Sequence, residues 1–379
     1  MEKLTIVHVI TGLGTGGAEH MLYRLLKSHR SHKIKSSVIS LTGKGTVGKK
    51  IQAIGVPVYV IEAKPGKVLT VRNLFSLLRI LREVKPEIIQ GWMYHGNLAA
   101  TIIALFSFPP IPVYWNIRQS LNSLSDERPL TKNVIKLGAI LSRLPKGIIY
   151  NSRLSIEQHE RIGFSPKRRY FIPNGFDIPE VSMAEGQNLI RQDGQIGDET
   201  KWIIGHIARF HPKKDHVTFF EAARLVLNQR SDVLFLAVGR GIERSNAELW
   251  KMIQMLKLEN DVRLVGETEN ISDIYSSLNM LVSSSCWGEG FPNVIAEAMA
   301  SGIVCVGTDV GETAHVIGST GTVVLPRDPV ALAEAILGQL SLPLDIKRAM
   351  SLEARSRISE LFALEKIAQE YLSIYRLRT

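Results

Sequence analysis

Residues 288–297 read GEGFPNVIAE, and they follow the apolar run MLVSSS at 280–285. A run of this length and composition is typical of a buried strand, and Pro292 suits the first turn of a helix. Glu289 therefore falls in the connecting loop, and Glu297 lies between one and two turns into the helix. A strand, a glycine-containing loop and a helix in this order form the repeating unit of a parallel sheet covered by helices.

The same alternation fills the first half of the chain. Short β-branched runs predict buried parallel strands at KLTIVHVI, KSSVISL, PVYVIEA, PEIIQGW, PVYWNI, GIIYNS and RYFIPN. Stretches with helical spacing lie between them: AEHMLYRLLKSHRS, GKKIQAIG, VRNLFSLLRILREVK, NLAATIIALF and RLSIEQHERIG. This order of elements predicts an α/β fold with a doubly wound parallel sheet.

The pattern stops at 173–200, where Pro, Gly, Asn and Asp interrupt the sequence, and it resumes beyond that stretch. We therefore expect a first Rossmann-like domain at 1–172, a linker at 173–200 and a second Rossmann-like domain at 201–350. Residues 351–379 predict a helical tail that packs back towards the first domain. Two such domains would bind a ligand at the carboxyl ends of their sheets, in a cleft between them.

The chain has 379 residues and a net charge of +10, and this charge is unevenly distributed. Residues 1–169 hold 26 Lys and Arg against 9 Asp and Glu, a net +17, whereas the rest holds 20 against 27, a net −7. A basic half indicates an anionic partner, such as a membrane surface, a phosphorylated lipid or nucleic acid. Solubility alone is the alternative explanation.

No apolar run reaches the ~18 residues that a membrane span requires, and the N-terminus does not resemble a secretory signal. The two cysteines, Cys286 and Cys305, lie in apolar stretches, and we expect both to be buried free thiols. We therefore expect a cytoplasmic protein, held peripherally on the inner face of the cytoplasmic membrane through its basic half.

Residues 10–20, ITGLGTGGAEH, place three glycines at the G-x-G-x-x-G spacing of dinucleotide-binding folds. Such folds require an acidic residue at the end of the second strand to hold the ribose hydroxyls, and Leu41 and Thr42 stand there instead. An NAD-dependent dehydrogenase is therefore disfavoured. The glycines can still bring helix-terminal amides close to a phosphate, or form a tight turn that binds nothing.

Residues 288–297 contain both hydrogen-bond donors and hydrogen-bond acceptors. The amides of Phe291 and Asn293, at the start of a helix, can donate to phosphate, and the carboxylates of Glu289 and Glu297 can accept from sugar hydroxyls. This combination suits a sugar nucleotide. An exposed acidic loop followed by an ordinary helix is the alternative.

A second loop supplies cations. In HIARFHPKKD, Arg209 follows a predicted strand and Lys214 lies five residues later. Two cations on one loop can stabilise a diphosphate leaving group as its negative charge develops. Taken alone, they would more often be solvated surface charges.

From end to end the chain resembles the retaining glycosyltransferases of family 4, which have the GT-B fold of two Rossmann-like domains. The resemblance rests on GLGTGGAE, on NSRLS and IPNGFD before the linker, and on ARFHPKKD, VGRG and GEGFPNVIAEAMASG after it. The Glu-x7-Glu spacing with its glycine and proline is the most specific of these elements. WMYHGN and EGFPNVIAEAMA are most similar to bacterial members that build surface polysaccharides such as lipopolysaccharide or capsule.

The resemblance implies a role for each matching residue. Gly17 would offer its amide to the donor phosphate or the acceptor, and His95 would approach the donor sugar from the first domain. Arg209 and Lys214 would bind the diphosphate. The candidate catalytic residues are His95, Arg209, Lys214 and Glu289.

The remaining implied contacts lie mostly in the second domain. Glu289 would contact the donor sugar and Glu297 the ribose hydroxyls, while Gly290, Phe291, Pro292 and Asn293 would face the sugar and phosphate. The base would be recognised by backbone between 263 and 267. Second-rank candidates are Gly16, Arg118, Asn151 and Gly266.

The chain departs from the family pattern at one point. After TDVG the family usually has a Glu a few residues on, where this chain has GETAHVIG. Glu312 is out of register and His315 stands nearby, so neither residue receives a role.

These residues together predict a retaining hexosyltransferase that uses a nucleotide diphosphate sugar, with UDP as the first choice of nucleotide. The acceptor would be a hydroxyl of a lipid-linked or polysaccharide glycan. The sequence contains no D-x-D pair, so we expect no metal and no other cofactor, with Arg209 and Lys214 replacing the charge of a metal ion. The first half offers no evident carboxylate nucleophile, which favours a same-face displacement over a covalent intermediate.

Two alternatives remain. A nucleotide-sugar epimerase of the same fold would share the architecture but needs catalytic acids. A non-catalytic binder of an anionic ligand or of nucleic acid would explain the basic half but not Glu289 and Glu297. No interleaved aromatic and basic motif is present, so nucleic acid is not an expected partner.

Overall fold

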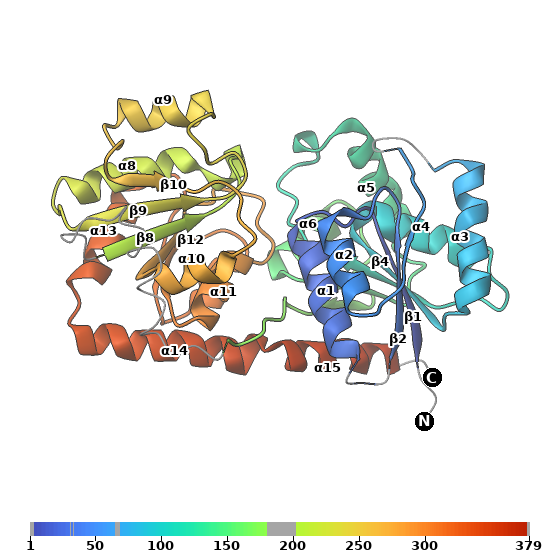
Figure 1. Ribbon diagram of the computed structural model, residues 1–379. Coiled ribbons are helices and arrows are strands. Elements are labelled where there is room, and N and C mark those ends of the chain that lie inside the picture. Colours follow the sequence, from blue (N-terminus) through green and yellow to red (C-terminus); the bar gives the residue numbers. More distant parts are fainter. Residues whose placement is uncertain (1–3, 31, 33, 65–68, 180–201, 377–379) are drawn as a thin grey trace. The chain divides into compact units, whose positions relative to one another are not determined.

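The computed structural model describes residues 4–30, 32, 34–64, 69–179 and 202–376. The chain divides into two units, of which the first comprises Met1–Gly175 and Leu364–Thr379 and the second Phe176–Ala363 (Figure 1). The chain therefore changes unit at 175–176 and again at 363–364. Most of the linker predicted at 173–200 lies outside the described residues.

The first unit contains a sheet of seven parallel strands in the order β3-β2-β1-β4-β5-β6-β7. The strands are β1 (Thr5–Ile10), β2 (Lys35–Ser40), β3 (Val58–Val60), β4 (Ile88–Trp92), β5 (Val113–Ile117), β6 (Gly147–Tyr150) and β7 (Arg169–Phe171). Its helices are α1 (Gly17–His29), α2 (Gly45–Ala53), α3 (Val71–Val84), α4 (Met93–Leu105), α5 (Pro129–Leu141), α6 (Arg153–Arg161) and α15 (Leu364–Arg376), with a 3-10 turn η1 (Leu124–Asp126).

Two apolar cores cover the two faces of this sheet. On one face, α3, α4 and α5 bury side chains such as Leu77, Ile103 and Ile135. On the other face, α1, α2 and α15 bury theirs, with Leu22 and Tyr371 among them. Both faces are covered, which explains why the strands are apolar runs instead of alternating patterns.

The second unit contains a sheet of six parallel strands in the order β10-β9-β8-β11-β12-β13. The strands are β8 (Trp202–Ile207), β9 (Val233–Val238), β10 (Val262–Leu264), β11 (Met280–Ser283), β12 (Val304–Thr308) and β13 (Thr322–Val324). The helices are η3 (Pro212–Lys214), α8 (His216–Leu227), α9 (Ala247–Met255), α10 (Ile271–Ser277), α11 (Asn293–Ala300), α12 (Thr313–Ile317), α13 (Pro329–Ser341) and α14 (Leu344–Phe362).

Both sheets place their first six strands in the doubly wound order 3-2-1-4-5-6. The predicted fold class, two Rossmann-like domains, is therefore confirmed. The helical tail predicted at 351–379 is divided by the structure: α14 belongs to the second unit, and α15 packs against α1 in the first. The break between these two helices falls at Ala363.

Helix α5 is a structural element that the sequence patterns did not predict. Its sequence, PLTKNVIKLGAIL, contains Thr, Asn and Gly, which are weak helix formers. Its apolar residues are also split between two environments, because Ile135 is buried whereas Leu137 and Ile140 are exposed.

Among the described residues, no single helix is both long and apolar enough to cross a bilayer. Helices α13 and α14 meet that test only as a pair, and they are bent by 112° at their junction.

Candidate active site

A capped turn at the carboxyl end of β8 carries the candidate cations of the second unit. The His211 ring Nδ1 accepts a hydrogen bond from the Lys213 amide at 3.2 Å, which fixes the start of turn η3. Asp215 adopts a left-handed backbone conformation (φ 47°) and caps α8, its Oδ1 accepting from the Thr218 amide at 3.3 Å. Lys214 is thereby held between two capped elements.

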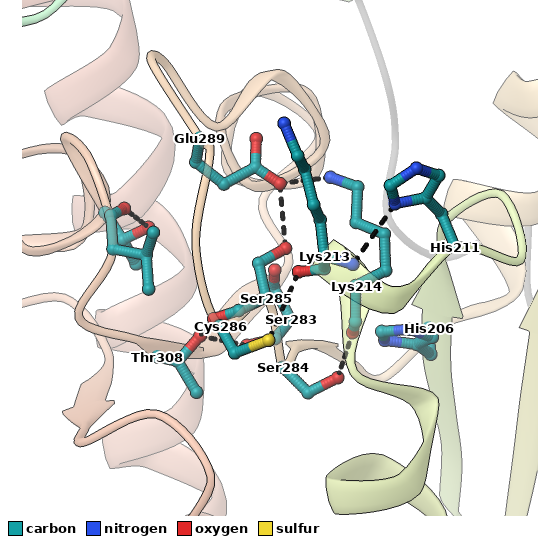
Figure 2. A network of polar contacts seen from close by, with 12 residues as sticks. His206, His211, Lys213, Lys214, Ser283, Ser284, Ser285, Cys286, Glu289 and Thr308 are labelled. Carbon is teal, nitrogen blue, oxygen red and sulfur yellow. Dashed lines mark hydrogen bonds and ion pairs between the residues drawn. The ribbon is translucent and has the colours of Figure 1, made fainter. Parts of the chain in front are cut away.

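Lys214 forms an ion pair with Glu289, which lies in the loop between β11 and α11 (Figure 2). The Oε1 atom of Glu289 accepts hydrogen bonds from Lys214 Nζ and from Ser285 Oγ, the latter at 2.7 Å. The side chains of Lys214 and Glu289 are 26% and 18% exposed. Partial burial strengthens the attraction between the two charges relative to an open surface.

The Glu289 carboxyl is subject to opposing effects. Burial raises its pKa, whereas the positive charge of Lys214 and the hydrogen bonds from Lys214 and Ser285 lower it. The lowering effects outweigh burial, so the pKa lies below its usual value of 4.5. Glu289 is therefore ionised at neutral pH and can accept hydrogen bonds from hydroxyl groups.

Close backbone contacts hold the Glu289 loop in place. Ser284 Oγ donates to the Lys214 carbonyl at 2.8 Å, which joins this loop to the cationic turn (Figure 2). Gly311 has φ 65°, and a Cβ atom there would lie 2.5 Å from the Glu289 carbonyl oxygen. The amide of Glu312 donates to the Gly290 carbonyl at 3.1 Å. Glu312, to which the sequence assigned no role, thus supports the loop through its backbone.

Two further cations lie around the same turn. Arg209 is exposed just beyond β8, and the Lys213 side chain passes over Gly288, where a Cβ atom would approach Lys213 Cδ to 2.8 Å. Burial lowers the pKa of His211, and the charges of Arg209, Lys213 and Lys214 lower it further. Three cations therefore act on one short turn, a suitable environment for a diphosphate.

The start of α11 differs from its prediction. Pro292 is the residue that precedes the helix, not part of its first turn, and α11 begins at Asn293. The Asn293 amide donates to the Phe291 carbonyl at 3.0 Å, so it is not free for a phosphate. The Phe291 amide has no hydrogen-bond partner in the part of the chain that the structure describes. The Phe291 ring itself is buried and stacks on Phe176 with centroids 5.8 Å apart.

Glu297 and Gly266 lie in the same unit. The Tyr275 hydroxyl donates to Glu297 Oε2 at 2.8 Å, which orients a half-buried carboxylate on α11. The Gly266 amide donates to the Ile242 carbonyl at 3.0 Å, and its carbonyl accepts from the Gly239 amide at 2.7 Å. Both backbone groups of Gly266 therefore form hydrogen bonds within the protein, and its second-rank place among the binding residues stays a prediction.

The glycine loop of the first unit leads into α1. Gly16 is the N-cap residue and Gly17 the first helical residue, as the phosphate hypothesis requires. The carboxylate of Glu19, however, folds over Gly16 and occupies the space that a side chain there would need. A carboxylate already lies at this helix terminus, which makes the site less favourable for a second anion than for a neutral hydroxyl.

His95 lies in the first turn of α4, which follows β4 without an intervening loop. Met93 makes this sharp change of direction with a left-handed backbone conformation (φ 60°). His95 is half-buried, and its burial lowers the pKa of the imidazole, which is therefore neutral at pH 7. Asn151 follows β6 and is buried, and its Oδ1 has no hydrogen-bond partner among the described residues.

Arg118 is buried in a polar network, not presented to a ligand. Its guanidinium donates to the Tyr371 hydroxyl at 2.9 Å and to the Ile172 carbonyl at 3.2 Å, and it also bonds to Asn116 and Asn174. Tyr371 belongs to α15, so the network fastens this last helix to the end of β5. The predicted second-rank binding role of Arg118 gives way to a structural one.

The substitution Arg118→Met is expected to lower the free energy of unfolding by about 3 kcal/mol, because several buried acceptors lose their donor. Urea denaturation measures this loss. Arg128→Met, at an exposed position, should change it by less than about 0.5 kcal/mol. A folded Arg118→Met protein that has normal stability but no longer binds nucleotide sugars would restore the binding role.

The two cysteines differ in exposure, and the described side chains that could bind a metal ion are dispersed. Cys305 is buried as expected, whereas Cys286 is half-exposed in the Glu289 loop, with its thiol 3.5 Å from the Pro212 carbonyl oxygen. Across the described ranges, no three His, Cys, Asp or Glu side chains gather in a way that could hold a metal ion.

Three residues of this site were missed by the sequence patterns: Ser285, Lys213 and Tyr275. Ser285 ends the MLVSSS run, and a polar residue at the carboxyl end of a buried parallel strand could have signalled it. Lys213 is adjacent to a predicted residue. Tyr275 had no signal, because its contact with Glu297 joins two helices that are separate in the sequence.

Two family models match the chain. Residues 15–180 match glycosyltransferase family 4, and residues 201–341 match glycosyl transferases group 1. With both halves matched, the chain belongs to the family 4 and group 1 glycosyltransferases, and its two doubly wound units form the domains of the GT-B fold.

Several known proteins are similar to this chain. N-acetyl-alpha-D-glucosaminyl L-malate synthase of Bacillus anthracis is 28% identical over 251 residues, 65% of this chain and 63% of that protein. The match thus spans less than two thirds of the relative. The putative glycosyltransferase EpsF of Bacillus subtilis is 24% identical over 80% of this chain and 79% of its own length.

Solved structures show the same fold. Anabaena Alr3699/HepE in complex with UDP superposes with a TM-score of 0.85 at 20% identity, covering 98% of this chain and 100% of that one. The same protein in complex with UDP-glucose superposes with a TM-score of 0.84 over 98% and 99% of the two chains, also at 20% identity.

Proposed function

We propose that this chain transfers a hexose from a nucleotide diphosphate sugar to a hydroxyl of a lipid-linked or polysaccharide acceptor. The donor is a UDP-sugar, the anomeric configuration is retained and no metal takes part. The contact between Lys214 and Glu289 is the observation that carries this proposal, since it joins a phosphate-binding cation to a carboxylate that accepts from sugar hydroxyls.

The charged side chains of the site can stabilise the charge that develops when the bond between sugar and diphosphate breaks. As the bond between the anomeric carbon and the diphosphate oxygen opens, its electron pair moves onto the diphosphate. Arg209, Lys213 and Lys214 stabilise that negative charge, and Glu289 holds the sugar through its hydroxyls. The acceptor oxygen bonds to the same face of the anomeric carbon, and the acceptor proton passes to the departing diphosphate.

The choice of UDP is supported by a structural neighbour. HepE was solved with UDP and with UDP-glucose, and it shares the fold of both units with this chain. The choice of a neutral hydroxyl acceptor is supported by the Glu19 carboxylate at the start of α1, which disfavours a second anion beside Gly17.

An assay with and without acceptor tests this function. The full chain is incubated with UDP-glucose, UDP-galactose, UDP-N-acetylglucosamine or GDP-mannose, alone and with a panel of alkyl glycosides, and products are followed by proton NMR. We expect nucleotide release that depends on acceptor, and a product whose anomeric signal has the configuration of the donor. Conversion of the donor sugar without any acceptor would favour an epimerase, and an inverted product would contradict retention.

A further inference from the structure

Helices α4 and α5 of the first unit leave large apolar side chains exposed near their carboxyl ends. Phe108 is 99% exposed and Ile140 is 74% exposed. They belong to a set of exposed apolar residues, here called the amino-edge surface: Leu105, Phe106, Phe108, Leu137, Ile140 and Leu144. Single exposed apolar residues are ordinary, but a group of this size marks an interaction site.

The topology brings these residues to one edge of the sheet. Helices α4 and α5 pack against each other on the same face (Figure 1). The chain after α4 leads into β5 and the chain after α5 leads into β6, and these two strands pair in parallel with Tyr114 opposite Gly147. The Lys146 amide donates to the Val113 carbonyl at 2.8 Å, which joins the starts of the two strands.

The sequence around this surface carries mainly positive charge, and the nearby Glu87, just before β4, accepts a hydrogen bond from the Thr5 amide at 2.9 Å. Residues 128–156 contain six Lys and Arg and no Asp or Glu, and residues 88–125 also contain no Asp or Glu. Lys136, Arg143 and Lys146 are exposed among the apolar residues of α5 and the turn that follows it. The amino-edge surface is therefore apolar and cationic, without an anion among its own residues.

We propose that the amino-edge surface docks the first unit onto an anionic lipid bilayer, with the apolar side chains in the interface and the cations at the headgroups. A second copy of this chain fits poorly, because two surfaces of like charge would face each other. Nucleic acid offers no partner for six exposed apolar side chains. The biological use of this docking rests on the proposed lipid-linked acceptor, whereas the docking itself needs no acceptor.

Helix α3 provides a matched control. Phe75 is 68% exposed, but it lies in the second turn of a helix that begins beyond the carboxyl end of β3. Because α3 runs antiparallel to the strands, Phe75 lies away from the edge at which β5 and β6 begin. Its replacement removes an exposed aromatic ring, as the replacement of Phe108 does, at a different place on the same unit.

Sedimentation of the full chain with vesicles tests the proposal. Phosphatidylcholine vesicles are compared with phosphatidylcholine vesicles that contain phosphatidylglycerol, at low and high salt. We expect sedimentation only with the anionic vesicles, and its loss at high salt. The double substitution Phe108→Ser with Ile140→Ser should lower vesicle partitioning by about 10-fold or more, and Lys136→Gln by about 5-fold. Phe75→Ser should leave it unchanged.

Three outcomes would overturn this inference: no sedimentation with anionic vesicles, equal loss for Phe75→Ser, or a dimer in solution that the double substitution converts to a monomer. The last would assign the surface to a second copy of the chain. The midpoint of thermal unfolding shows whether each variant is folded, and its shift with added UDP-sugars is measured separately. Vesicle binding without any response to nucleotide sugars would sustain the docking surface and reject the proposed function.

Discussion

The substitution Glu289→Gln is expected to lower kcat/KM by about 10²–10³-fold. Glutamine keeps the shape of the side chain but removes the negative charge that pairs with Lys214 and that, in the proposed function, accepts from the sugar hydroxyls. It also places an amide that donates hydrogen bonds where a carboxylate now only accepts. Nucleotide release in the steady state measures the effect, and the midpoint of thermal unfolding shows whether the variant is folded.

Glu334→Gln is the matched control for this substitution. Glu334 is exposed on α13 in the same unit, so the same chemical change there should leave turnover unaltered. Full activity in the Glu289 variant would remove Glu289 from the catalytic groups. Equal loss in the Glu334 variant would show that the assay responds to charge in general.

The substitution Lys214→Ala is expected to weaken donor binding and turnover by about 10²-fold, because a diphosphate loses a cation in a partly buried site. A second effect concerns Glu289. Without Lys214, burial remains as the largest influence on this carboxyl, so its pKa rises. Residual activity should therefore begin to fall at a higher pH than in the wild type as the solution is acidified, since protonation of Glu289 removes the acceptor.

Lys251→Ala, at an exposed position on α9, is the control for Lys214→Ala. It removes the same charge from the same unit without touching the turn at the end of β8. A pH profile of Lys214→Ala that matches the wild type would mean that Lys214 does not govern the ionisation of Glu289.

The fold was largely predictable because its strands are buried on both faces. Such strands appear as short apolar runs, and all seven strands of the first sheet, together with β11 of the second, fall within the runs named above. Helix α5 was missed because its sequence contains weak helix formers, Thr, Asn and Gly. The tail was predicted as one element, although α14 and α15 belong to different units, since the apolar spacing of a helix does not show which core it joins.

The site was predictable where chemistry depends on residue type and position in a strand–loop–helix unit. Lys214 and Glu289, which the sequence assigned to one donor ligand, lie at neighbouring strand ends and form an ion pair. Arg118 was misjudged because its partner Tyr371 comes from another element, α15. In the structure, the Arg118 guanidinium that the sequence assigned to a ligand donates its hydrogen bonds within the protein.

Thermal unfolding of the full chain with a panel of nucleotide sugars tests the central claim most directly. A UDP-sugar present at ~100 times its dissociation constant should raise the free energy of unfolding of the wild type by about 2.7 kcal/mol, and Lys214→Ala should show little of this stabilisation at the same concentration. The claim would be contradicted if no nucleotide sugar stabilised the wild type, or if one stabilised Lys214→Ala equally well.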